Sequence, residues 1–228
     1  MKTLLSLVTL LIAPALGAAT FEGTVNFKTT DGKNRAMEMN YSVKDSRMRI
    51  DMKGGKDGSG YTVMDMGKME MMMVMESEKM YMTMSLKDVA EKAAKEVKDE
   101  ATFEKTNETE KILGYTATKY ISTYKGETTD MWLAEGIGSF MMPGENPMAG
   151  GRGSAPKGWE RALQGKSLFP LRIVSKDKKG KETSRMEVTA IEKKKLPESL
   201  FAVPAGYTKF DMGNMGGMLK GLMQGLGR

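Results

Sequence analysis

The sequence contains neither cysteine nor histidine, and this double absence excludes whole classes of functional site. Without cysteine there is no disulfide framework, no thiol nucleophile and no lipid-bearing cysteine after a leader segment. Without histidine a Ser-His-Asp triad cannot form, and a zinc site of the Cys/His type lacks its ligands. The Asp and Glu residues are scattered along predicted strand exteriors and helix faces, where they are solvated charges. We therefore expect a protein that is not an enzyme and uses no cofactor.

Long apolar runs are also scarce. The apolar stretch at Leu4–Ala13 is too short to span a bilayer, which takes about 20 residues. It follows the basic Lys2 and precedes the small residues of 14–19, and this order is typical of a secretory signal peptide. We predict that residues 1–19 are removed by cleavage after Ala19 and that the protein is exported, to the periplasm or beyond the cell.

The charge balance is only mildly positive. There are 35 Lys and Arg against 29 Asp and Glu, a formal net charge of +6. Such a surplus favours solubility and a weak attraction to anionic lipid surfaces. Because an exported chain without a recognisable nucleic-acid-binding motif has little use for nucleic acid, we do not expect that partner.

Methionine, in contrast, is abundant, and it recurs at every second position through much of the stretch between Tyr61 and Leu86. Period two is the signature of a β-strand. Gly67-Lys68 has the Gly-first order of a type II′ hairpin turn, and Glu76 to Lys79 form a four-residue link. Both registers place nine methionines on one face of an antiparallel meander of three strands. The nine are Met64, Met66, Met69, Met71, Met73, Met75, Met80, Met82 and Met84.

Alternating patterns on either side predict more strands joined by short turns. These strands are expected at 21–28, 37–43, 47–52, 116–124, 128–134, 169–176 and 182–191, with a one-turn helix and an extended edge within 196–207. A helix from Ser85 to about Lys98 carries an apolar stripe and is interpreted as a lid on the concave face of the sheet. The charged segment 100–111 is expected to be a loop followed by a strand edge.

Two segments have compositions that oppose regular structure. Residues 141–158 are rich in Gly and Pro without periodicity and predict a mobile loop inside a domain that spans 20–210. The Gly- and Met-rich tail 211–228 spaces its apolar residues at helical intervals, but its glycines weaken a helix. We predict a flexible tail that becomes helical only on an apolar surface, which would allow peripheral membrane contact there.

Four segments resemble domain-of-unknown-function family 4412, a group of exported bacterial proteins related to the outer-membrane lipoprotein carrier superfamily. They are Arg47–Asp51, Met80–Met82, Thr129–Ala134, and Leu196–Phe201 with Pro204–Tyr207. The resemblance implies a mainly β (α+β) fold: a strongly curved antiparallel sheet forming an open half-barrel, its concave face covered by one or two helices. In the carrier proteins that hollow receives acyl chains. Arg47 and Arg49 are the nearest polar candidates for ligand contact, or are solvent-facing strand charges.

The methionine face admits several interpretations. The first is core alone, although a rigid core would favour Val and Ile, which also prefer strands. The second is a malleable hollow for a lipid, an acyl chain, a lipoprotein or an apolar peptide, because methionine adapts to many apolar shapes. Thioethers also select Cu(I), with Met64, Met71 and Met84 converging across strands. A fourth interpretation is oxidant scavenging through reversible sulfoxide formation.

Overall fold

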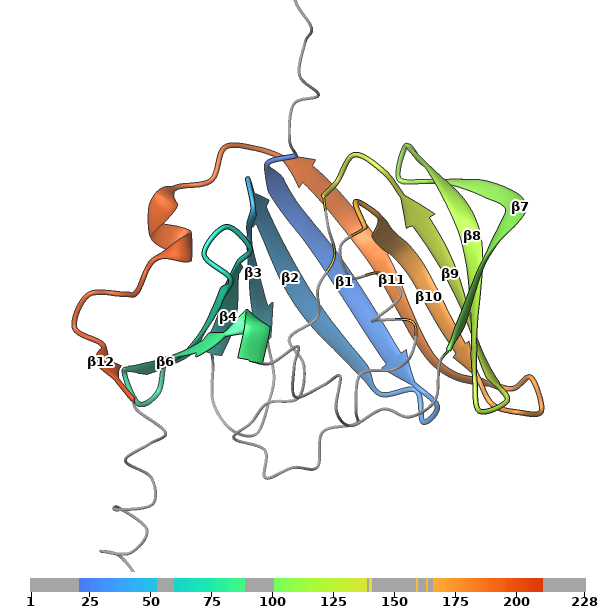
Figure 1. Cartoon of the computed structure of the whole chain (residues 1–228), viewed down its shortest axis with the longest axis horizontal. Helices are drawn as coiled ribbons and strands as arrows, with labels where there is room; N and C mark the ends of the chain where they lie inside the picture. Colours follow the sequence, from blue (N-terminus) through green and yellow to red (C-terminus); the bar gives the residue numbers. More distant parts are fainter. Residues whose placement is uncertain are drawn as a thin grey trace, which may run out of the picture.

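A computed structural model describes residues 21–52, 60–88, 101–138, 140, 159, 163 and 166–210 (Figure 1). These residues form one sheet in the order β12-β6-β5-β4-β3-β2-β1-β11-β10-β9-β8-β7. The strands are β1 (Gly23–Asp31), β2 (Ala36–Lys44), β3 (Arg47–Met52), β4 (Gly60–Asp65), β5 (Glu70–Met75), β6 (Met80–Ser85), β7 (Thr102–Ile112), β8 (Tyr115–Tyr124), β9 (Glu127–Ala134), β10 (Phe169–Lys176), β11 (Glu182–Lys193) and β12 (Thr208–Lys209). A one-turn 3-10 helix, η1 (Glu198–Phe201), precedes β12.

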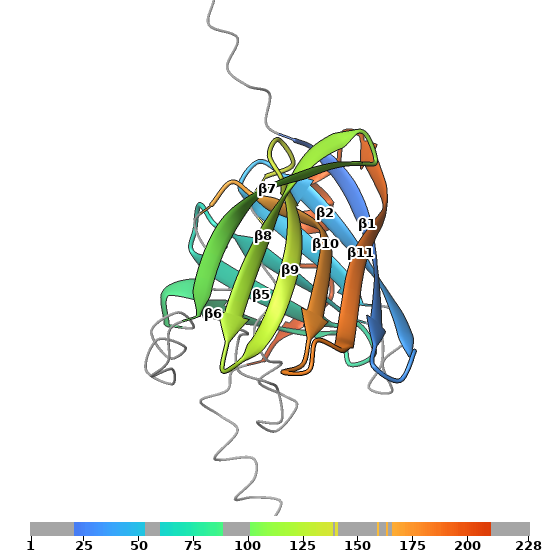
Figure 2. The same ribbon diagram turned by 90° about the vertical axis from the view of Figure 1, so that its right-hand side faces the viewer.

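The sheet consists of two meanders joined at their inner strands. Strands β1 to β6 run outward in one direction and β11 to β7 in the other, and β1 pairs antiparallel with β11 where they meet. Figures 1 and 2 together show the sheet curving, with β4 to β6 and β7 to β9 at opposite ends of the curve. This arrangement confirms the mainly β fold and the open half-barrel.

The concave side holds the larger core. Four aromatic side chains lie at its centre with ring centroids 5.5–5.9 Å apart: Phe27, Tyr41, Phe140 and Phe169. Phe140 comes from the connection between β9 and β10, and Trp159 and Leu163 of the same connection are buried in the same cluster. Aromatic rings contribute large buried areas and prefer such tilted or edge-on contacts. In this core, both meanders therefore pack against the connection between β9 and β10.

A second, smaller core lies on the outer side of the sheet. The segment Leu196–Lys209, which we call the strap, runs across β3 to β5 and ends beside β6 as β12 (Figure 1). Leu196 and Phe201 of the strap are buried against Tyr61, Val63 and Val74. Strands β3 to β6 are thus covered by protein on the outer face as well.

The link between β4 and β5 corrects one turn prediction. It contains four residues, Met66 to Met69, and the left-handed residue is Met69 with φ 51°, so no type II′ turn centred on Gly67 forms. Asp65 stabilises this link, because its Oδ1 accepts a hydrogen bond from the Lys68 N–H at 2.9 Å. The predicted register is nevertheless correct. The two-residue link Gly67-Lys68 and the four-residue link Met66 to Met69 have the same centre, so both place Met64 opposite Met71.

The expectation that segment 100–111 begins with a loop is wrong, whereas the strand edge expected after that loop is present. Residues 102–112 form the edge strand β7, which is paired with β8 and interrupted by a register shift between Lys105 and Thr109. Its residues are mostly exposed on both faces. An edge strand of this kind carries no apolar alternation, and its charged side chains protect the open edge.

The covering helices are not supported by the described residues. Only Leu86 to Asp88 of the predicted helix 85–98 are described as helical. The remainder of that helix, the predicted signal peptide at 1–19, the predicted loop at 141–158 and the tail 211–228 lie outside the described residues. Among the helical segments within the described ranges, none is long and apolar enough to cross a membrane.

Candidate functional site: a methionine-lined concave face and an outer groove

The structure brings most of the nine predicted methionines together in cross-strand rows. Met64 lies opposite Met71, which lies opposite Met84, so the three candidate Cu(I) ligands form one row. A second row contains Met73 and Met82, and a third contains Met75 and Met80. Side chains of directly opposed residues share a face of the sheet. Seven of the nine methionines therefore share the concave face, and Met66 and Met69 lie in the turn that joins β4 to β5.

Burial varies from one methionine of this face to the next. Met64 and Met71 are 1% and 3% exposed, and they belong to the concave core with Trp159 and Phe140. Four methionines of β5 and β6 are half-buried; they are Met73, Met75, Met80 and Met84. Met82 is buried, at 1% exposure, whereas Met69 in the turn is 45% exposed. The face is thus part core and part accessible surface.

Met48 extends the first row by one strand. It lies on β3 opposite Met64 and is 3% exposed, so four methionines stand side by side across β3 to β6. The buried Tyr41 hydroxyl donates a hydrogen bond to the Met48 Sδ atom at 3.4 Å. The sequence prediction left Met48 out of the site because it lies beyond the 61–86 stretch, although its period-two spacing with Ile50 was visible.

The indole of Trp159 is a polar feature of the concave core that the sequence did not single out. Trp159 is 6% exposed, and its Nε1 atom is buried without a hydrogen-bond partner. Within the described part of the chain the other such atom is Oδ1 of Asn40, a half-buried residue whose neighbour Met39 is buried in the core. An indole N–H can only donate. The described side chains of the concave core therefore include one free hydrogen-bond donor.

Arg47 and Arg49 face the outer side, and there they hold the strap. The Arg49 guanidinium lies 3.4 Å from the centroid of the Tyr61 ring and donates to the Leu200 carbonyl at 3.1 Å. Arg47 lies 5.1 Å from the ring centroid of Phe201. Their side chains are only 22% and 14% exposed. The interpretation as solvent-facing charges is thus wrong, because the strap covers both side chains. They lie on the face opposite the methionines, away from a ligand held there.

An ion-pair cluster fixes the start of η1. Glu198 accepts hydrogen bonds from Arg47 at 2.5 Å and from Lys44 at 2.8 Å. These two cations, of which Arg47 has the larger effect, hold the pKa of the Glu198 carboxyl at about 2, below its ordinary 4.5. Lys44 also donates to the Leu196 carbonyl at 2.7 Å. The strap is therefore attached to β2 and β3 mainly by charge-assisted hydrogen bonds, which are stronger than neutral ones.

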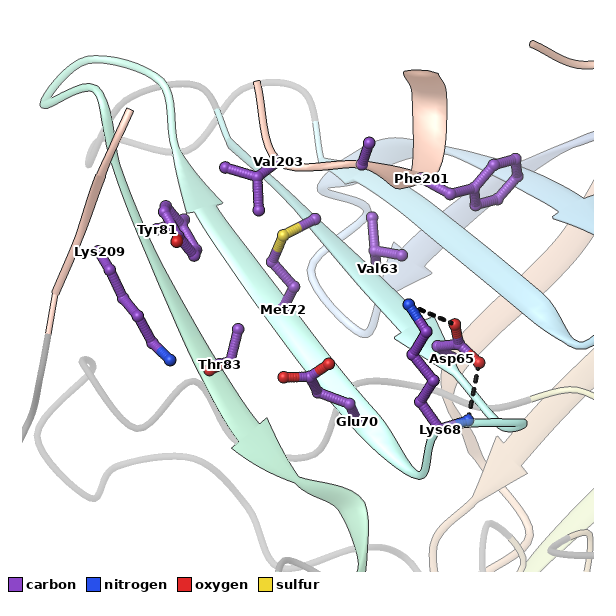
Figure 3. A pocket seen from close by; sticks show the side chains of 11 residues that line it. Val63, Asp65, Lys68, Glu70, Met72, Tyr81, Thr83, Phe201, Val203 and Lys209 are labelled. Carbon is purple, nitrogen blue, oxygen red and sulfur yellow. Dashed lines mark hydrogen bonds and ion pairs between the residues drawn. The ribbon is translucent and has the colours of Figure 1, made fainter. Parts of the chain in front are cut away.

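A groove of about 420 Å³ lies beneath the strap on the outer face (Figure 3). Its floor is apolar, with Val63, Met72 and Tyr81, and Phe201 and Val203 of the strap form one wall. Asp65 and Lys68 pair at one end, with Nζ and Oδ2 4.0 Å apart. The sequence did not predict this groove, because the groove forms only where the strap crosses strands that lie more than a hundred residues earlier in the chain. One residue could have indicated it: Met72 lies between Met71 and Met73, so its side chain is on the opposite face of the sheet from the period-two row.

The chain offers no site for a hard or borderline metal in its described part. Within the described residues, no group of three His, Cys, Asp or Glu side chains is placed to hold a metal ion. A soft metal would have to use thioethers alone, and the row at Met64, Met71 and Met84 is the arrangement that could supply them.

Comparison with solved structures shows similarity of fold. The chain is similar to PNGF-II in its C2 crystal form, with 16% identity and a TM-score of 0.51, over 88% of this chain and 33% of that one. It is also similar to an uncharacterized conserved protein from Thermus thermophilus (10% identity, TM-score 0.49, 83% of this chain and 90% of that one). A putative outer membrane lipoprotein-sorting protein domain from Vibrio parahaemolyticus matches at 10% identity and TM-score 0.32, over 82% and 90%. The chain spans about a third of PNGF-II.

Comparison at the level of sequence gives a family and no characterised relative. No curated protein matches the chain. The family model described as a domain of unknown function (DUF4412) matches residues 21–207. That range contains all twelve strands except the last, and it contains the segments whose resemblance to this family was noted in the sequence. The protein therefore belongs to the family of the domain of unknown function DUF4412.

Proposed function

We propose that this protein is an exported, non-enzymatic binding protein that holds an apolar ligand against the methionines of its concave face. The ligand class is a lipid, an acyl chain or an apolar peptide. One observation carries the proposal: the methionine face is fully buried at Met64, Met71 and Met82 and only half-buried at Met73, Met75, Met80 and Met84. A face that served only as core would be covered throughout.

A comparison of the two faces of β4 and β5 supports a ligand-binding face over a face that is only core. On the outer face, under the strap, β4 and β5 present Tyr61, Val63 and Val74, which are residue types that favour strands and pack rigidly, and a single methionine, Met72. On the concave face β5 presents Met71, Met73 and Met75, and β4 presents Met64 next to Thr62 and Gly60. Because strand propensity acts equally on both faces, the difference reflects what each face contacts. Methionine is flexible and polarizable, and it suits a surface that must fit several apolar shapes.

The rim at β6 is the natural entrance. Beyond β6 the described sheet continues only with the two residues of β12, which pair with Met80 and Tyr81. Met84 lies past that pairing and is half-buried. A chain-like ligand that enters here would first contact Met80 and Met84 and then reach the buried row. Binding would draw its free energy from apolar area removed from water, about 25 cal/mol per Å².

Two adjacent residues of β6 provide a matched test. Met84 faces the concave side and Thr83 lines the outer groove, and both are half-buried. We expect Met84→Glu to abolish binding of a fluorescent acyl-chain probe, because it places a charge on the apolar path. Thr83→Glu should leave the probe affinity unchanged. Circular dichroism would verify that both variants fold. Equal affinities in the two variants would contradict a ligand site on the methionine face.

A second candidate function, soft-metal binding, is favoured by the alignment of Met64, Met71 and Met84 in one cross-strand row. Native mass spectrometry of protein purified from the exported fraction separates the two candidates. A retained aliphatic adduct supports the carrier function, and a copper adduct without lipid supports the metal function. Replacing the three methionines by leucine keeps volume and apolarity. This variant should lose Cu(I) binding if the row is a metal site and keep acyl-probe binding if it is not.

A further inference from the structure

We propose that the indole N–H of Trp159 is the polar anchor of the ligand site and donates a hydrogen bond to a neutral acyl carbonyl, of an ester or an amide. This inference rests on the proposed function, since it names the ligand group that the concave face would recognise. It starts from the buried Nε1 atom that has no partner in the protein. Buried polar groups are nearly always satisfied, so an exception in the core calls for an explanation.

The rest of the concave core shows that such groups are satisfied where the protein can do so. Tyr41 in the same cluster is 2% exposed, and its hydroxyl donates to the Met48 sulfur. The other large rings at the centre are phenylalanines, namely Phe27, Phe140 and Phe169, which bring no donor. A phenylalanine at 159 would supply apolar bulk without an unsatisfied group. The tryptophan thus introduces a donor that the free protein does not use.

The other tryptophan of the chain is a useful contrast. Trp132 on β9 is half-buried, and its ring lies under two cations, with Arg172 Cζ at 5.1 Å and Lys119 Nζ at 5.5 Å from the ring centroid. Its large π face therefore has a structural role. Trp159 shares no such contact among the described residues and sits at 6% exposure in the cluster that contains Met64 and Met71.

The surroundings select the chemical class of the acceptor. Among the described residues, the buried hydrophobic cluster that holds the Tyr41 hydroxyl and this indole contains no Lys or Arg, and Thr62, which is buried on the same face as Met64, is uncharged. An ionised carboxylate placed there would be buried without a cation, which is strongly unfavourable. A neutral carbonyl loses much less on burial and needs only one donor. The site therefore fits an acyl ester or amide, with its chain on the methionines, better than a free fatty acid or a plain hydrocarbon.

The two tryptophans make a direct test possible. A ¹⁵N-labelled sample of the whole protein should show two indole N–H resonances, since the sequence contains two Trp residues. Trp159→Phe and Trp132→Phe assign them. Methyl laurate should move the Trp159 resonance downfield, as a new hydrogen bond does, and leave that of Trp132 in place. Tridecane, the hydrocarbon probe, should not move the Trp159 resonance downfield.

Affinity measurements on the same variants complete the test. We expect Trp159→Phe to weaken methyl laurate binding by roughly threefold to tenfold, the effect of one neutral hydrogen bond, and to leave tridecane binding unchanged. Trp132→Phe should change neither. If both probes bind the wild type and Trp159→Phe alters neither affinity, the inference is wrong and the proposed function stands. If neither probe binds, the proposed function itself fails.

Discussion

Substitution of Met71 by lysine is the most direct test of the concave face. Met71 is 3% exposed and lies between Met64 and Met84 in the central methionine row. To remain buried, the new lysine must give up its proton. At pH 7, against an ordinary pKa near 10.4, this costs about 5 kcal/mol at about 1.4 kcal/mol per pH unit. Lost methionine burial adds about 1.5–3 kcal/mol. The sum is comparable with the whole stability of a typical domain, about 5–15 kcal/mol.

The neighbouring Glu70 is the control. It lies on the opposite face, lines the outer groove and stands across the strands from Asp65. A lysine at this position would meet that carboxylate and remain solvated. We expect Glu70→Lys to change the free energy of unfolding by no more than about 0.5 kcal/mol, as substitutions at solvated positions usually do. Urea denaturation followed by circular dichroism measures both variants.

The pH dependence of the Met71→Lys variant gives an independent check. The lysine pKa is lowered in the folded protein, so between the two pKa values the unfolded chain binds more protons than the folded one. Stability must then rise with pH, by up to about 1.4 kcal/mol per unit, until the unfolded lysine also loses its proton near pH ~10. The wild type and Glu70→Lys should lack this rise. Equal losses at positions 70 and 71, or a pH-independent loss at 71, would refute the assigned faces.

Two further predictions concern the ends of the domain. Glu198 has its pKa lowered to about 2, so its contribution to strap attachment is complete above its ordinary 4.5 and is lost as the pH falls toward 2. The protection factor of the Phe210 N–H, which donates to the Tyr81 carbonyl in β6, is its intrinsic exchange rate divided by the observed rate; it should fall over this range, and Glu198→Gln should show the lower protection factor already at neutral pH. Deletion of 211–228 should leave the melting temperature nearly unchanged, because its glycines oppose firm docking, and should weaken liposome binding if the tail contacts membranes; a large drop in melting temperature would show that it packs on the domain.

The β architecture could be predicted from the amino-acid sequence wherever local signals specify it. Period-two alternation predicted the strands around the methionine meander, and the register that sets Met64 opposite Met71 is confirmed. A slip of one residue would have sent the whole row to the other face. The full extent of the edge strand β7 was not predicted, for the complementary reason: neither of its faces is buried, so no alternation marks it.

The contacts made by each face of the sheet could not be predicted from the sequence, because they depend on packing between distant segments. Arg47 and Arg49 alternate with apolar residues and so look solvent-facing, yet the strap arrives from about 150 residues away and covers them. The same long-range contact creates the outer groove. The unsatisfied donor of Trp159 likewise exists only because the connection between β9 and β10 places that ring in the concave core. Burial is a property of the packed elements together, and contacts between distant segments leave little trace in any one window of sequence.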